Sequence, residues 1–314
     1  MPAHRESASE DTAPHDPPSP STHQADNRAV ADRAESSGFI RNVQVYEPHR
    51  VGLPPVVPYV TELWRRRDFA AHLSRSNMRA ANTRTFFGQL WLVINPLLLA
   101  LVYYVMVSII SSRQGGMPFL AHLTAGIFIY YFVSGSISTG ATSVTAGGSL
   151  IANMAFPRLL MPLSAVRTAF VRFLPTIPVY LVIHTVAGLP WSWVQLLALY
   201  FLACTVLFAA GLAAVFATFQ VYFRDTTAFL PYALRIGLYL SPVLWFIEQV
   251  PGRLQAFVMA NPLYYLIGGW TDLLVRAKAP EPVVWVGAAV IAVVTLVAGS
   301  MFFMSREREF AVRL

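Results

Sequence analysis

Six long apolar segments occupy most of the chain after residue 85. They run approximately over residues 86–110, 119–145, 162–187, 194–221, 228–247 and 283–304. Each has about the 20 apolar residues that an α-helix needs to cross the hydrocarbon core of a bilayer. The pattern therefore predicts an all-α fold, that of a polytopic membrane protein with six transmembrane helices.

A basic amphipathic helix is predicted over residues 59–85, just before the first apolar segment. Val60, Leu63, Trp64 and further apolar residues recur at spacings of three to five, and six arginines lie among them. This spacing gives a helix one apolar and one basic face, which suits a helix lying on a membrane surface. Nucleic-acid binding is the alternative for such a basic stretch. The span that follows favours contact with membrane lipids, so we expect no nucleic-acid partner.

The remaining segments complete the predicted organisation. Residues 1–58 are polar or irregular and hold no long apolar run, so we expect a disordered tail and an irregular lead-in. Residues 248–282 are apolar but are interrupted by Pro251, Asn261-Pro262 and Gly268-Gly269. Because the Asn-Pro pair would bisect a seventh span, we expect short helices there that re-enter the outer leaflet. The predicted divisions are 1–58, 59–85, a six-span domain over 86–304, and a tail over 305–314.

The distribution of charge orients these spans. Charged residues make up 12% of the chain, and only 13 of them lie between Thr85 and Met304; soluble domains average about 25%. Arginines are concentrated before the first span and in the tail, with others after the second and fourth spans. The positive-inside rule places these segments in the cytoplasm. We expect a multi-pass protein of the cytoplasmic (plasma) membrane with both termini in the cytoplasm.

The residues present exclude several kinds of chemistry. The single lysine, Lys278, lies between two alanines, so the Gly-Lys-[Ser/Thr] sequence of a phosphate-binding loop is absent. No set of His, Cys and Glu residues has metal-binding spacing, and the predicted spans contain no acidic residue for a proton relay. We therefore expect no catalytic residue, metal or cofactor in this chain. The energy for any uphill transport would come from another subunit.

Three arginines are predicted to lie inside the membrane: Arg167 and Arg172 in the third span and Arg235 in the fifth. Such an arginine normally faces a cavity or a partner, so these three are candidates for contact with an anionic substrate. The alternatives are bonds to backbone carbonyls, pairing with Asp225, or extension to the interface. Aromatic rings in the spans could stack on sugars or form the interfacial belt. The candidates for the substrate channel among them are Tyr103, Tyr104, Tyr131 and Tyr239.

Five motifs in a fixed order resemble those of a known family. They are FFGQLWLVINPLLLALVYY in the first span, IANMAFPRLLMPLSAV after the second, YFRDT after the fourth, SPVLWF closing the fifth, and ANPLYYLIGGW in the outer loop. With the charged tail SREREFAVRL, this order resembles the membrane-spanning permease of the type 2 ABC exporters that move polysaccharides such as O-antigen, teichoic acid and galactan. The resemblance covers about residues 60–314. It implies a homodimer working with two copies of a separate ATPase subunit, which would bind ATP and Mg²⁺.

The resemblance also implies a substrate and roles for particular residues. It implies export of a lipid-linked polysaccharide to the outer face, and SNMRAANTRTFFG with the arginine-rich composition is similar to the galactan exporters of actinobacteria. The ATPase would dock on Leu150, Asn153, Phe156, Pro157 and Arg158, and on Trp64, Arg67 and Asp68 of the amphipathic helix. Asn261, Pro262 and Tyr264 would belong to an outer gate. The alternatives are the permease of an ABC drug or lipid exporter and, with less support, a membrane-embedded glycosyl- or acyltransferase.

Overall fold

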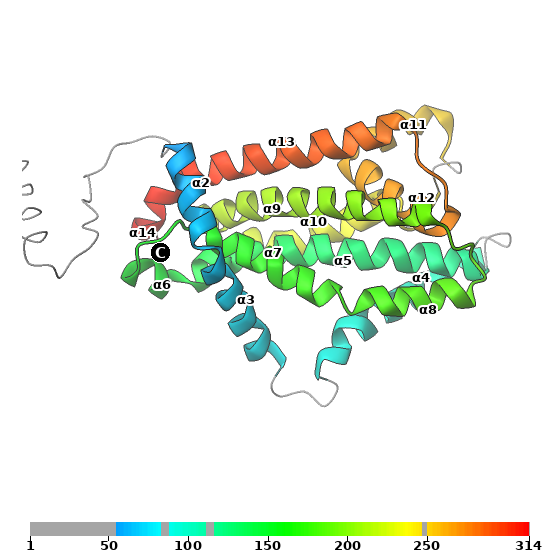
Figure 1. Ribbon diagram of the computed structural model, residues 1–314, viewed down its shortest axis with the longest axis horizontal. Coiled ribbons are helices and arrows are strands. Elements are labelled where there is room, and N and C mark those ends of the chain that lie inside the picture. Colours follow the sequence, from blue (N-terminus) through cyan, green and yellow to red (C-terminus); the bar gives the residue numbers. More distant parts are fainter. Residues whose placement is uncertain (1–54, 83–87, 111–115, 247–249, 314) are drawn as a thin grey trace, which may run out of the picture. The chain divides into compact units, whose positions relative to one another are not determined.

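A computed structural model describes residues 55–82, 88–110, 116–246 and 250–313, and all secondary structure in these residues is helical (Figure 1). They belong to one compact unit; the predicted tail over 1–58 lies almost entirely outside the described residues. The centre of the bundle is α5 (Met117–Ala146), most of which is buried. It packs against α4 (Trp91–Ile110), α7 (Leu160–Phe173) and α9 (Ala198–Tyr222), and α13 (Pro282–Arg306) packs along α9.

Short helices lie at both ends of this bundle. At one end, called here the α6 end, are α2 (Val56–Arg65), α6 (Gly148–Asn153), a 3-10 turn (Glu307–Glu309) and α14 (Phe310–Arg313) (Figure 1). Toward the other end are α11 (Gly252–Met259), a π-helical turn (Tyr264–Gly268) and α12 (Gly269–Arg276). The indole of Trp270 on α12 donates to the carbonyl of Ala125 at 3.2 Å. The predicted short helices between the fifth and sixth apolar segments are therefore confirmed, and α12 packs into the bundle.

Among the described residues, five helical segments are long and apolar enough to cross a membrane. They correspond to the first, second, third, fourth and sixth predicted spans. The fifth, 228–247, contains α10 (Thr226–Leu240), a helix of 15 residues. Such a helix is about 22 Å long, which is shorter than a hydrocarbon core of about 30 Å. The all-α membrane fold is confirmed, whereas the count of six spans is not.

Pro242 explains why α10 ends early. A proline disfavours the helical conformation of the residue before it, and Ser241 is extended, with φ −86° and ψ 154°. The last two carbonyls of α10 accept hydrogen bonds from the indole of Trp245 (3.2 Å) and the amide of Asn261 (2.8 Å). Both donors come from the segment that follows α10, so this segment satisfies the backbone groups that the helix end leaves free.

Two predicted helices are each found as a pair. The amphipathic helix predicted over 59–85 is α2 followed by α3 (Arg67–Asn82), with a break at Arg66, and residues 83–85 lie outside the described residues. The third predicted span is α7 followed by α8 (Thr176–Val186), and the break contains Pro175, which has no N–H with which to continue a helix. Short 3-10 turns, Gly88–Leu90 and Trp193–Leu197, precede α4 and α9.

The contact between α9 and α13 depends on two glycines. A Cβ atom added to Gly211 would lie 2.2 Å from the carbonyl oxygen of Thr295, and one added to Gly299 would lie 2.3 Å from the carbonyl oxygen of Gly211. Inside a bilayer, helices gain nothing by exchanging lipid contacts for equally apolar ones, so close approach between small residues is an important source of their association. These two positions therefore have no room for a side chain.

Replacing Gly299 by alanine is expected to destabilise the bundle, because α13 must move away from α9 to admit the methyl group. Overpacking of this kind costs about 1–3 kcal/mol. The measurement is the midpoint of thermal unfolding of the detergent-solubilised protein. Gly252→Ala on α11, where an added Cβ meets nothing within 4 Å, is the control. Equal midpoints for the two variants would contradict the close packing.

Candidate functional site

Residues 148–158, which connect α5 to α7, form part of the α6 end and are called here the docking segment. The turn at residues 153–155 is exposed, whereas Ile151 before it and Pro157 after it are buried. Of the five candidates for ATPase contact, Asn153 is exposed, Pro157 is buried, and Leu150, Phe156 and Arg158 are half-buried. The docking segment thus has a short exposed turn next to residues that pack against the rest of the protein.

The carboxylate of Glu307 fixes the end of the docking segment. It accepts hydrogen bonds from the Tyr59 phenol of α2 (2.5 Å) and from the backbone amide of Arg158 (2.7 Å). The Arg158 guanidinium donates in turn to the backbone carbonyl of Glu307. Burial, and secondly the Glu307 carboxylate, raise the pKa of the Tyr59 phenol, so the phenol stays protonated and remains a donor. We call Tyr59, Arg158 and Glu307 the Glu307 cluster.

The amphipathic helices hold the same segment through a second set of contacts. The guanidinium of Arg66, at the break between α2 and α3, donates to the carbonyl of Ala155 at 2.7 Å and pairs with Glu62 at 2.5 Å. On α3, the ring of Phe69 lies 5.1 Å from the ring of Phe156. The docking segment is therefore attached both to the amphipathic helices and, through Glu307, to the end of α13.

The residues predicted as a second ATPase contact lie on the exposed surface of α2 and α3. Trp64 is 67% exposed, and the guanidinium carbon of Arg67 lies 4.9 Å from the centre of its ring. Asp68 is also exposed. An exposed tryptophan next to an arginine is typical of the residues that dominate protein interfaces. The two predicted docking surfaces thus share the same supporting helices.

The three predicted membrane arginines have different surroundings. Arg167 donates to the carbonyl of Ala71 on α3 at 2.9 Å, beside a hydrogen bond of 2.9 Å between Thr168 and Ser74. It therefore fastens α7 to α3 and lies apart from the other channel candidates. In the part of the chain that the structure describes, neither Arg172 nor Arg235 has a hydrogen-bond or ion-pair partner.

Four of the seven channel candidates come together between α4, α5 and α10. The hydroxyl oxygens of Tyr103 and Tyr239 are 3.3 Å apart, and their rings meet edge to face with centres 6.2 Å apart. Tyr131 and Arg235 lie near the Tyr103 phenol, and Arg235 is exposed on α10 one turn before Tyr239. We call these four residues the Tyr103 cluster. Tyr104 does not belong to it and packs, half-buried, against the hydrophobic core.

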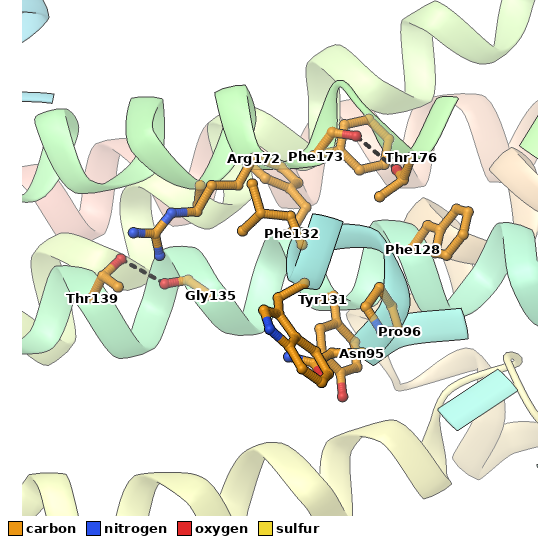
Figure 2. Close-up of a pocket in the computed structure, with 13 residues that line it drawn as sticks. Asn95, Pro96, Phe128, Tyr131, Phe132, Gly135, Thr139, Arg172, Phe173 and Thr176 are labelled. Carbon is orange, nitrogen blue, oxygen red and sulfur yellow. Dashed lines mark hydrogen bonds between the residues drawn. The ribbon is translucent and has the colours of Figure 1, made fainter. Parts of the chain in front are cut away.

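A cavity of about 220 Å³ lies between α4, α5, α7 and α8 (Figure 2). Its walls include Arg172 and also Tyr131, which the cavity therefore shares with the Tyr103 cluster. Trp91 and Asn95 contribute from the first turns of α4. The Nε atom of Arg172 is buried and has no hydrogen-bond partner. The cavity thus brings a charged group and several aromatic rings to one place inside the apolar part of the bundle.

The predicted outer-gate residues connect their loop to α10. The side-chain amide of Asn261, besides donating to the end of α10, accepts a hydrogen bond from the Leu263 amide at 3.0 Å. Pro262 lies between them, and the ring of Tyr264 meets that of Tyr265 edge to face at 5.1 Å. This loop is thus hydrogen-bonded to the end of α10, the helix that also carries Arg235 and Tyr239.

Comparison with known proteins assigns this chain to a family. The sequence profile of the ABC-2 type transporter family matches residues 68–275, which are more than half of the chain. The chain belongs to the ABC-2 type transporter family. The matched residues of this ABC-2 chain run from α3 to α12, so they contain the docking segment, the cavity and the Tyr103 cluster but not Tyr59 or Glu307.

Two relatives of this ABC-2 chain carry the name "O-antigen export system permease protein RfbA". The chain is 29% identical to one from Klebsiella pneumoniae over 215 residues, which are 67% of this chain and 81% of that protein. It is 26% identical to one from Myxococcus xanthus over 258 residues, which are 82% of this chain and 99% of that protein. The similarity to the second relative extends over nearly all of that protein.

The sequence analysis missed the residues that support the docking segment. Tyr59 and Glu307 are 248 positions apart, so no local pattern connects them, and the arginine tract 65–67 does not reveal that Arg66 marks a helix break. One sequence signal could have indicated them. Glu307 and Glu309 are acidic residues at the end of a span, where the positive-inside rule accounts only for the basic ones.

Removing the Glu307 carboxylate is expected to loosen the docking segment. Glu307→Ala leaves the Tyr59 hydroxyl and the Arg158 amide without their acceptor, and each unsatisfied buried group costs about 1–3 kcal/mol. Hydrogen–deuterium exchange of the backbone amides of Phe156 and of residues 158–160 should therefore accelerate about tenfold or more. The control is Glu281→Ala, which removes an exposed carboxylate at the other end of α13. Unchanged exchange in Glu307→Ala would show that the cluster does not fix the segment.

Proposed function

We propose that this chain is the membrane-spanning subunit of an ATP-driven exporter that moves a lipid-linked polysaccharide from the cytoplasm to the outer face of the membrane. The observation that carries the proposal is the similarity to O-antigen export permeases over 82% of this chain, together with membership of the ABC-2 family. Membership of this family indicates a transport subunit rather than an enzyme. The absence of a phosphate-binding loop from the sequence supports ATP hydrolysis by a separate partner.

In this proposal two copies of the chain form a homodimer that works with two copies of the ATPase subunit, which bind ATP and Mg²⁺. The ATPase docks on the exposed turn of the docking segment and on Trp64, Arg67 and Asp68. Two features support the docking surface. The hydrogen bonds of the Glu307 cluster fix the chain that follows the turn, and Trp64 is highly exposed. A rigid docking segment is what mechanical coupling requires, because a loose one would absorb the movement of the ATPase.

The Tyr103 cluster supplies the chemistry for the substrate. Aromatic faces stack on sugar rings, and the guanidinium of Arg235, without a partner in the described chain, suits the phosphate groups of a lipid carrier. We take galactan as the first candidate for the polysaccharide, on the resemblance of SNMRAANTRTFFG and the arginine-rich composition to galactan exporters.

The plasma membrane is the proposed location. The shared position of α2 and the end of α13 at the α6 end supports two cytoplasmic termini.

Depletion of the protein from its own cells tests this function. The proposal predicts that a lipid-linked polysaccharide accumulates in the cytoplasmic leaflet, and mass spectrometry of the extracted lipid identifies the sugar. Expression of the wild-type chain should restore export, whereas Arg235→Leu should lower the export rate about tenfold or more, as expected for the loss of a charge-assisted contact of ~1.5–3 kcal/mol.

The control for Arg235→Leu is Arg224→Leu, which removes an exposed charge at the turn between α9 and α10. Depletion without accumulation of any lipid-linked polysaccharide would refute the proposed function, and altered sensitivity to drugs instead would favour a drug exporter. Full export by Arg235→Leu would leave the function intact but would remove Arg235 from the substrate path.

A further inference from the structure

The cavity beside Arg172 has the composition of a binding site. Its volume of about 220 Å³ is many times the 10–15 Å³ or so that one water molecule needs. Aromatic rings form much of its wall: Trp91, Phe128, Tyr131, Phe132 and Phe173. Polar groups are few and come from different helices, which is the usual arrangement where polar contacts orient a ligand in a largely apolar site.

Arg172 is the charged group of this cavity. The structure gives its guanidinium no hydrogen-bond or ion-pair partner among the described residues, and its Nε atom is shielded from solvent. Figure 2 shows the side chain extending from α7 toward α5 at the level of Gly135 and Thr139. A guanidinium inside a membrane protein is costly unless an anion or a hydrogen-bond acceptor meets it. A ligand that fills the cavity would therefore be expected to carry a negative charge.

The contacts of α3 give the depth of Arg172. Arg167 and Thr168, one turn or more before Arg172 on α7, hydrogen-bond to Ala71 and Ser74 of the amphipathic helix. Arg172 lies five residues beyond Arg167, which is about 7.5 Å along a helix. If α3 lies at the membrane surface, as its amphipathic pattern indicates, Arg172 is a short distance below the headgroup level. An anionic membrane lipid carries its charge near this depth together with an apolar body.

From the cavity, the unpartnered charge and its depth, we infer that the space between α4, α5, α7 and α8 binds the phosphate-bearing headgroup of a membrane lipid. The planar guanidinium of Arg172 matches phosphate oxygens with paired N–H donors. The first residue of α4, Trp91, also lines the cavity. The aromatic walls accommodate the adjoining apolar or ring portion of the lipid.

Two lipids could supply this headgroup. One is the lipid carrier of the exported polysaccharide, and this assignment rests on the proposed function. The other is an anionic phospholipid of the surrounding leaflet, in which case the site is independent of the substrate. Both share the chemistry of a phosphate next to an apolar chain, so a binding experiment with separate probes distinguishes them.

The test is native mass spectrometry of the purified full-length chain, titrated in detergent with four probes. Polyprenyl diphosphate and phosphatidylglycerol are the two anionic candidates. Unphosphorylated polyprenol lacks the phosphate, and phosphatidylcholine has a phosphate whose charge is balanced. The wild-type chain should retain at least one anionic probe, and Arg172→Met should lower its affinity about tenfold or more, as for a lost charge-assisted contact. The control Arg224→Met removes an exposed arginine outside the cavity and should bind like the wild type.

A second variant keeps the test decisive if Arg172→Met does not fold. Gly135 lines the cavity, and a Cβ atom added there meets only the Cβ of Ala169, at 3.9 Å. Gly135→Leu should therefore fill the cavity without changing the charge, and it should weaken the same binding. Retention of polyprenyl diphosphate alone assigns the site to the carrier, and retention of phosphatidylglycerol assigns it to the leaflet.

Two results would overturn the inference: a wild-type chain that retains neither anionic probe in preference to polyprenol and phosphatidylcholine, or Arg172→Met and Gly135→Leu variants that both bind like the wild type. Because the measurement needs neither ATPase nor transport, it is independent of the depletion experiment. If depletion causes no accumulation of lipid-linked polysaccharide but phosphatidylglycerol still binds through Arg172, the proposed function fails and the lipid site stands.

Discussion

A charged group inside an apolar bundle must find an opposite charge, a hydrogen-bond partner or a ligand, because transfer out of water is otherwise too costly. This constraint separates five charged residues of the described chain into two kinds. Arg158, Arg167 and Glu307 are satisfied by contacts within the protein, and each of them fastens one segment to another. Arg172, half-buried beside the cavity, and Arg235, exposed on α10, have no hydrogen-bond or ion-pair partner in the described chain. The first kind builds the scaffold, and the second kind is available to a substrate or a lipid.

The satisfied charges also define a mechanical connection. The docking segment is tied through Glu307 to the end of α13, and α13 packs along α9 with glycines at the closest approach. Arg66 and Phe69 tie the same segment to the amphipathic helices, and Arg167 ties those helices to α7. A force applied at the exposed turn of the docking segment is thus carried into several helices at once. This arrangement suits a subunit whose energy comes from a partner outside the membrane.

The sequence predicted well what local patterns encode. Apolar runs predicted the helical class and the positions of the long helices, and Asn261-Pro262 correctly indicated short helices between the fifth and sixth apolar segments. It failed at the ends and breaks of helices. The periodicity of residues 59–85 continues through the break at Arg66, and hydropathy extended the fifth span past Ser241, where Pro242 ends the helix. At the site, the sequence named Tyr103, Tyr239 and Arg235 without a reason to group them. The sequence analysis grouped Arg167 with them, because the sequence does not show whether an arginine side chain has a hydrogen-bond partner in the fold.

We propose that a separate ATPase drives this permease by docking on residues 148–158. Native mass spectrometry of the complex, purified from its own cells in mild detergent, tests this coupling. The expected complex contains two copies of the chain and two copies of an ATPase subunit. In a chain carrying Phe156→Ala and Arg158→Glu, the ATPase should be lost while the permease dimer stays intact. Purification of the wild-type chain without any ATPase, or an unchanged complex with the double variant, would contradict it.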